Sequence, residues 1–251
     1  MLKKIIFVCM LSIASLLAFV SCSQETPQTP AKDLDYRGLY EMIKTHPTVS
    51  FLSVITNSRG APSNGGFPIF SSQDLNYLSS LSQEEFEEVR EAFIKKIEYA
   101  GIEYTDSIQN SYYIKVFDIL GGHEGMDRLI NFAQEYLALP SGWDQIEPLI
   151  PESLSLEQGN IYISMANYID KIARPIYETL ISKTIPNTRG DNPVCDWYLT
   201  QRLAIAGVAI STEEFIDCMT GGAATPLEIV ATGADLLGIW LDYEVCNHRW
   251  H

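Results

Sequence analysis

The sequence predicts a mainly α-helical protein, an irregular multi-helix bundle that ends in a C-terminal antiparallel helical hairpin. Three observations predict this fold class. Apolar side chains recur at three- and four-residue spacing along most of the chain. Four apolar stretches follow a Ser or Thr with Glu or Gln three residues later, a capping box that satisfies free backbone N–H groups where a helix begins. Glycine pairs and prolines separate the periodic stretches.

The first helix is expected to begin at a cap formed by Asp33 or Asp35 and to continue to about Lys44, where a His-Pro pair ends it. The stretch 48–57 is apolar and β-branched, which leaves helix and strand both open. Residues 58–68 contain three Gly and two Pro and are expected to form a loop.

In the next part of the chain, the clearest helix start lies at Ser82, which forms a capping box with Glu85. Acids occupy the first turn of this helix and lysines its last, as the helix macrodipole favours. An apolar and aromatic stretch follows and is closed by Gly121-Gly122. Helices are expected over residues 71–81, 82–100 and 124–139.

A long helix is expected from the capping box at Ser155 to about Lys183. Pro175 lies inside it and removes one intrahelical hydrogen bond, which predicts a kink. A second loop is expected at residues 186–193.

The last segment is expected to hold three helices, of which the first covers residues 195–210. A third capping box, at Ser211, predicts a short helix that ends after Cys218 at a glycine pair. The fourth box, at Thr225 with a proline at the first helical position, predicts a helix to about Cys246.

Three cysteines lie in the body of the chain, and the hairpin decides which of them pair. At 1.5 Å per residue, its two helices are about 24 and 31 Å long. If they pack antiparallel, Cys246 returns to the neighbourhood of Cys195, while Cys218 lies near the opposite end. A disulfide needs Cα atoms within about 7 Å. We therefore expect a Cys195–Cys246 bridge and a free thiol at Cys218, the alternative being three unpaired cysteines in a reducing compartment.

One motif, Gly121-Gly122-His123-Glu124-Gly125-Met126-Asp127, makes His123, Glu124 and Asp127 weak candidates for a ligand site. A zinc metalloprotease would place a second His four residues after the first, and Asp127 stands at that position. A helix start, with acids favoured by the dipole, is the simpler interpretation. No catalytic residue, metal ligand or cofactor is therefore predicted.

The mature chain is strongly acidic. Without residues 1–21 it carries 15 Lys and Arg against 32 Asp and Glu, a net charge of −17. Such a surface repels phosphate backbones, so no nucleic-acid partner is expected. The acids are scattered and form no D-x-D-x-D-G calcium loop, which makes solubility the simplest explanation of the charge.

The first residues predict where the protein is located. Lys3 and Lys4 precede an apolar run over residues 5–20, which as a helix would span about 24 Å, less than a bilayer core. That pattern is typical of a cleaved export signal rather than a transmembrane helix. Residues 22–32 are polar and proline-containing and are expected to form a flexible tether.

The end of this signal, Phe19-Val20-Ser21-Cys22, resembles the lipobox of bacterial lipoproteins. The resemblance implies a signal peptide over residues 1–21 and an acyl group such as palmitate on Cys22, the new first residue. Phe19 departs from the Leu usual in that family, and an ordinary cleaved signal is the alternative. Because no Asp directly follows Cys22, the outer membrane is expected rather than the inner one.

These observations lead to two functional hypotheses for a single helical domain over residues 33–251. The first is an envelope lipoprotein, bound to the lipid bilayer through Cys22, that acts as a binding or accessory module for an envelope protein or a small-molecule ligand. The alternative is a cell-envelope hydrolase whose residues, such as His123, Glu124 and the loop 58–68, meet only in three dimensions. The lack of a G-x-S-x-G, phosphate-loop or C-x-x-C motif favours the first.

Overall fold

Helices make up nearly all of the chain that the structure describes, as the sequence predicts. The computed structural model describes residues 35–46, 48–56, 67–99, 107–182, 192–220 and 226–247. Its elements are α2 (Tyr36–Lys44), β1 (Thr48–Ser50), α3 (Phe51–Thr56), β2 (Phe67–Ile69), α4 (Ser72–Ser80), α5 (Gln83–Tyr99), α6 (Ser107–Leu120), α7 (His123–Leu137), α8 (Trp143–Ile146), η3 (Glu147–Leu149), α9 (Leu156–Tyr168), η4 (Ile169–Ala173), α10 (Arg174–Ser182), α11 (Pro193–Thr220) and α12 (Pro226–Cys246).

The helix starts predicted in the first two thirds of the chain are confirmed by their hydrogen bonds. Asp35 accepts a hydrogen bond from the backbone N–H of Gly38 at 2.7 Å and caps α2. The backbone N–H of Ser82 donates to Glu85 at 2.9 Å, in front of α5. At Ser155 both bonds of the capping box are present and begin α9. These starts depend on neighbouring residues alone, which is why the sequence shows them.

The stretch that left helix and strand open contains both. Residues Thr48–Ser50 form β1, and α3 follows at once. The short strand pairs in parallel with β2, with Thr48 opposite Phe67 and Ser50 opposite Ile69. The expected loop therefore ends earlier than predicted, because its last two residues belong to β2, and residues 57–66 lie outside the described part.

The long helix predicted from Ser155 is divided into α9, a π-helical segment η4 and α10. Pro175 has no N–H to donate to the carbonyl of Lys171, four residues earlier, so the regular α-helical pattern is interrupted there. The N–H of Arg174 instead bonds to the carbonyl of Ile169, five residues earlier. Such π-helical turns inside α-helices are rare and often occur at functional positions.

The capping box predicted at Ser211 is wrong. The helix α11 continues without a break from Pro193 to Thr220, and Ser211 is fully buried within it. No Gly or Pro occurs from Val208 to Thr220, and every residue from Val208 to Ser211 is buried. Tertiary packing therefore overrides the local preference of serine for a helix end.

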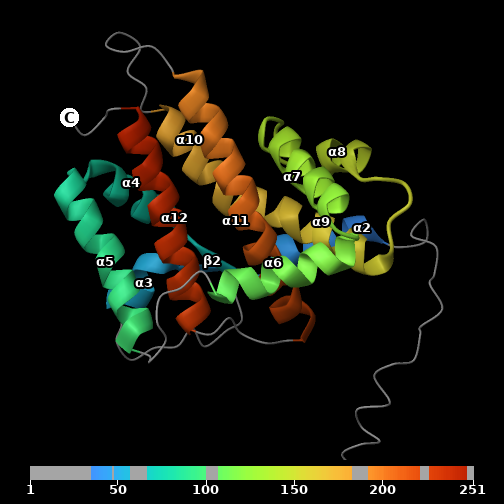
Figure 1. The fold of residues 1–251 in the computed structure, drawn as a ribbon, viewed down its shortest axis with the longest axis horizontal. Coiled ribbons are helices and arrows are strands. Elements are labelled where there is room, and N and C mark those ends of the chain that lie inside the picture. The colour runs from blue at the N-terminus through green and yellow to red at the C-terminus, as the bar shows by residue number, and fades with distance from the viewer. Residues whose placement is uncertain are drawn as a thin grey trace, which may run out of the picture.

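Helix α11 is the centre of the packing. It contacts α6, α7, α9 and α12, and α12 packs on α5 on its other side (Figure 1). The buried apolar side chains of all these helices belong to one continuous cluster. The predicted C-terminal hairpin thus forms the middle of the described structure rather than an appendage.

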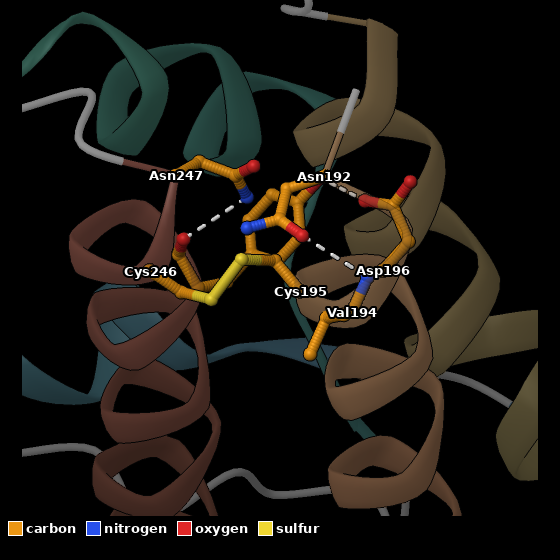
Figure 2. Close-up of a disulfide and its surroundings, with 7 residues drawn as sticks. Asn192, Val194, Cys195, Asp196, Cys246 and Asn247 are labelled. Carbon is orange, nitrogen blue, oxygen red and sulfur yellow. Dashed lines mark hydrogen bonds between the residues drawn. A yellow bond between two sulfur atoms is a disulfide. The ribbon is translucent and has the colours of Figure 1, made fainter. Parts of the chain in front are cut away.

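The predicted disulfide and hairpin are both confirmed. Cys195 in the first turn of α11 is bonded to Cys246 in the last turn of α12, with Cα atoms 5.9 Å apart (Figure 2). The hydroxyl of Tyr243 also donates to the carboxylate of Asp196 across the two helices, at 2.7 Å. These contacts can form only if the helices are antiparallel. The side chain of Cys218 lies outside the described side chains.

Candidate functional site at the π-helical segment

Charged residues gather at η4, in a part of the chain that is otherwise apolar. The side chains of α9 are mostly buried from Gly159 onwards, and Ile169, Ile172 and Ala173 of η4 are buried too. Three residues among them, Asp170, Lys171 and Arg174, are charged, yet their side chains are at least partly buried. A buried charge needs a partner, so the partners of these three residues define the cluster.

Asp170 is the acceptor at its centre. One carboxylate oxygen, Oδ2, accepts the hydroxyl of Tyr40 at 2.6 Å and the hydroxyl of Tyr136 at 2.7 Å. The other oxygen lies 3.4 Å from Nε of Arg174. The Asp170 and Arg174 side chains are 8% and 12% exposed, and both tyrosines are fully buried. One carboxylate therefore joins α2, α7 and α10.

Arg174 also closes the C-terminal end of α7. Its guanidinium donates to the carbonyl of Tyr136 at 3.0 Å, to that of Leu137 at 3.1 Å and to that of Leu139. The last carbonyls of a helix have no partner within the helix and carry its partial negative charge. A buried arginine supplies both the donors and the positive charge that this helix end requires.

Lys171 supplies a donor and a positive charge to the C-terminal end of α2. Its ammonium group donates to the carbonyl of Ile43 at 2.6 Å, in the last turn of that helix. A third cation repeats the arrangement elsewhere: Lys96 of α5 donates to the carbonyl of Ile55 at 2.6 Å and to that of Val54, at the end of α3. Burial lowers the pKa of Lys96. Long cationic side chains from distant parts of the chain thus complete three helix ends.

The two tyrosines of the cluster hold their protons tightly. Burial, followed by the hydrogen bond to Asp170 and its negative charge, raises the pKa of Tyr40 far above its ordinary value of 10. Burial also raises the pKa of Tyr136 to about 12. A phenolate beside a carboxylate in a closed site is unfavourable because both groups would be negative.

These properties favour a structural role for the cluster. Asp170 uses both carboxylate oxygens, and both tyrosine protons are engaged on it. Tyr136 additionally accepts the backbone N–H of Gly142 at 3.0 Å, which fixes the turn before α8. A general base must be able to reach a substrate proton, whereas here each polar atom already has a partner within the protein. The arrangement holds helices in place.

A second buried acid, Asp74, has a similar role at the start of α4. One of its oxygens accepts the backbone N–H of Ser71 at 2.9 Å and the hydroxyl of that serine at 2.8 Å. The hydroxyl of Ser50, at the end of β1, also donates to it. Asp74 therefore completes a capping box and ties the short strand to the helix.

The motif that includes His123, Glu124 and Asp127 covers the Gly121-Gly122 turn after α6 and the first turn of α7. His123 packs edge-on against Phe117, with ring centroids 4.9 Å apart. Glu124 forms an exposed ion pair with Arg128 at 2.7 Å, and Asp127 is exposed. The structure gives these three side chains no common partner, and their role as a ligand site stays a prediction.

The backbone conformation and the packing of the motif explain why its glycines are needed. Gly121 and Gly122 have φ values of +80° and +93°, which other residues rarely adopt. A Cβ at Gly125 would lie 2.0 Å from the carbonyl oxygen of Leu120. The positions of the glycines in the motif are therefore explained by the tight connection between α6 and α7.

The sequence indicated little of the Asp170 cluster. Its one visible sign is the group of charges next to Pro175 within a buried helix, but the partners Tyr40 and Tyr136 lie 130 and 34 residues earlier. Among the described side chains, no group of three His, Cys, Asp or Glu could hold a metal ion. The lipidation candidate Cys22 lies outside the described residues.

Comparisons with known proteins find no match among protein-family models, curated proteins or solved structures. Within the described residues, none of the helices has the length and apolar character needed to cross a bilayer.

Proposed function

We propose that this protein is an exported lipoprotein of the bacterial cell envelope, anchored through Cys22, that acts as a binding or accessory module. The observation that carries the proposal is the disulfide between Cys195 and Cys246. Disulfides persist outside the reducing cytoplasm. This agrees with an N-terminal sequence that resembles a lipoprotein signal, although the two features lie at opposite ends of the chain.

The chemistry of the described residues favours a binding module over a hydrolase. The buried acids Asp170 and Asp74 are each engaged by several donors from the protein itself. The predicted candidates His123 and Glu124 contact Phe117 and Arg128 instead of each other. An acid or base that serves catalysis needs access to a substrate, and Asp170 and Asp74 instead hold neighbouring elements together.

The anchor is tested by intact mass and membrane partitioning of the chain made in a bacterial host. The wild type is expected to begin at Cys22, to carry acyl chains and to sediment with membranes. Cys22→Ala is expected to be unacylated and either unprocessed or released. Cys9→Ala is the matched control, because Cys9 lies in the part of the signal that is removed, and it is expected to behave as wild type.

Two results would contradict the proposal. One is an unmodified chain that is cut elsewhere and stays soluble. The other is an equal loss of anchoring in Cys9→Ala and Cys22→Ala, since that would show a damaged export signal rather than a lost lipid. The hydrolase alternative would gain support only if substitution of His123 or Glu124 abolished an activity without changing the stability of the protein.

A further inference from the structure

The outer face of the C-terminal hairpin carries an unusual group of exposed apolar side chains. Most other large exposed apolar residues are single and lie on different helices. On α11, by contrast, they recur at three-, four- and seven-residue spacing, which places them on one side of the helix. We define the hairpin patch as Val194, Trp197, Tyr198 and Ile205 of α11 with Val245 of α12.

Contacts across the hairpin show that the two helices contribute to the same surface. The guanidinium of Arg202 lies 5.8 Å from the ring of Tyr198 and 3.7 Å from the carboxylate of Asp242. Val245 follows Asp242 by about one helical turn. The neighbouring Cys246 is bonded to Cys195 (Figure 2), so Val245 lies toward the end of α11 that carries Val194.

Few of the described charges near the hairpin patch are uncompensated. Arg202 offsets the charge of Asp242, while Asp196 keeps its negative charge and accepts a hydrogen bond from the hydroxyl of Tyr243. Helix α5 is more acidic, because six of its glutamates are exposed and only Glu91 among them has a described ion pair, with Lys95; the six are Glu84, Glu85, Glu87, Glu88, Glu91 and Glu98. An anionic lipid surface repels such a face, and the hairpin patch meets less repulsion.

The length of the tether makes contact with the bilayer feasible for any face. The residues between Cys22 and Asp35 can span at most about 45 Å. A folded chain of this size is roughly 45 Å across. An anchored domain is therefore held close to the lipid at a high effective concentration, so a weak preference is enough to orient it.

We propose that the hairpin patch lies against the lipid surface to which Cys22 anchors the chain. Trp and Tyr favour the boundary between lipid and water, because their rings are apolar and their N–H or O–H groups are polar. Of the tryptophans that the structure describes, Trp197 is 61% exposed, Trp143 is half-buried and Trp240 is fully buried. The inference rests on the proposed anchor, and it adds which face of the domain meets the membrane.

The test uses the full mature chain, acylated and reconstituted into vesicles of phosphatidylethanolamine and phosphatidylglycerol, with and without brominated phosphatidylcholine. Brominated lipid quenches tryptophan fluorescence only at close range. Brominated lipid is expected to quench a larger fraction of the tryptophan fluorescence in the wild type than in Trp197→Phe. Val194→Glu keeps Trp197 but adds a charge to the patch, and it is expected to reduce this loss.

The matched control is Trp197→Phe combined with Tyr99→Trp. Tyr99 is 95% exposed on α5, so the control returns an exposed tryptophan on the acidic face. Its emission is expected to be quenched no more than that of Trp197→Phe. Equal quenching of this control and the wild type would overturn the proposal, because contact would then be indiscriminate.

Intact mass separates the two proposals. If the chain is acylated at Cys22 but Trp197 is not quenched, the anchor stands and the orientation is wrong. Val194→Cys tests whether a second copy of the chain covers the patch instead. A cross-link between two copies through this cysteine would overturn the orientation in the same way. An unacylated chain would overturn both proposals.

Discussion

The carboxylate of Asp170 accepts the hydroxyl of Tyr40 at 2.6 Å, although the two residues lie 130 positions apart in the sequence. This bond attaches α2, the first described helix, to the π-helical segment in the middle of the chain. Both side chains are withdrawn from solvent. A hydrogen bond of this kind, between a neutral donor and a buried charge, contributes more to stability than a neutral pair does.

We expect Tyr40→Phe to lower the free energy of unfolding by about 2 kcal/mol, because it removes a donor to a buried carboxylate. Urea denaturation monitored by circular dichroism measures the change. Tyr77→Phe, on the exposed face of α4, is the matched control and should change stability by less than about 0.5 kcal/mol. Equal effects of the two substitutions would show that the bond to Asp170 contributes nothing.

The cluster also predicts a loss of stability at high pH. Below about pH 10 both tyrosines are protonated in the folded and unfolded states, and the stability is fully present. Above that pH the unfolded chain releases its phenolic protons, while Tyr136 keeps its proton until its raised pKa, about 12, is reached. Each such tyrosine lowers the free energy of unfolding by about 1.4 kcal/mol per pH unit across this interval.

Urea denaturation between about pH 9 and 12 checks this expectation. Tyr136→Phe should make the decline less steep by roughly the contribution of one tyrosine, and Tyr77→Phe should leave it unchanged. A decline of equal slope in Tyr136→Phe and wild type would contradict the proposed origin of the pH dependence.

Gly207 allows α11 and α9 to approach closely. A Cβ at this position would lie 2.4 Å from a ring carbon of Tyr168, which is fully buried and donates its hydroxyl to the carbonyl of Leu203. Because the ring cannot move without losing that bond, we expect Gly207→Ala to destabilise the protein by about 1–3 kcal/mol.

Gly238 is the matched control for this substitution, because it also lies inside a helix of the hairpin. A Cβ there would meet Nε of Arg90 at 3.5 Å, an ordinary contact. Gly238→Ala should therefore leave the free energy of unfolding unchanged or raise it by up to about 1 kcal/mol, as helix propensity predicts. Similar thermal unfolding temperatures for both variants would contradict the close approach at Gly207.

Loss of the Cys195–Cys246 bridge should lower the free energy of unfolding by about 4 kcal/mol, the chain-entropy value for a loop of this length. Denaturation of Cys195→Ala/Cys246→Ala and of wild type with reductant should agree. Reductant should affect Cys218→Ala as it affects wild type. If the double variant is as stable as the oxidised protein, the bridge contributes nothing to folding.

The parts of the fold that the sequence predicts are those that depend on adjacent residues. The caps at Asp35 and Ser155 involve residues three positions apart, and the hairpin follows from the lengths of two helices. The failure at Ser211 has the opposite cause, since its local pattern is overridden by the packing around α11. A local capping pattern begins a helix only where the packing does not continue a helix through it.

The candidate site could not be predicted in the same way. Pro175 indicates an irregular helix, but nothing near it in the sequence identifies Tyr40 or Tyr136 as partners of Asp170. Those contacts are set by how α2 and α7 pack on the chain that follows them. The disulfide could be predicted from the sequence, because only three cysteines lie in the body of the chain and the helix lengths bring two of them together.

The cationic helix ends have a consequence for the order in which the protein can fold. The last carbonyl groups of α2 are completed by Lys171, which lies 128 residues after Ile43. During synthesis the N-terminus emerges first, so the end of α2 stays incomplete until more than half of the sequence has been made. The last carbonyl groups of α2 are therefore left without this partner until Lys171 has been added to the chain.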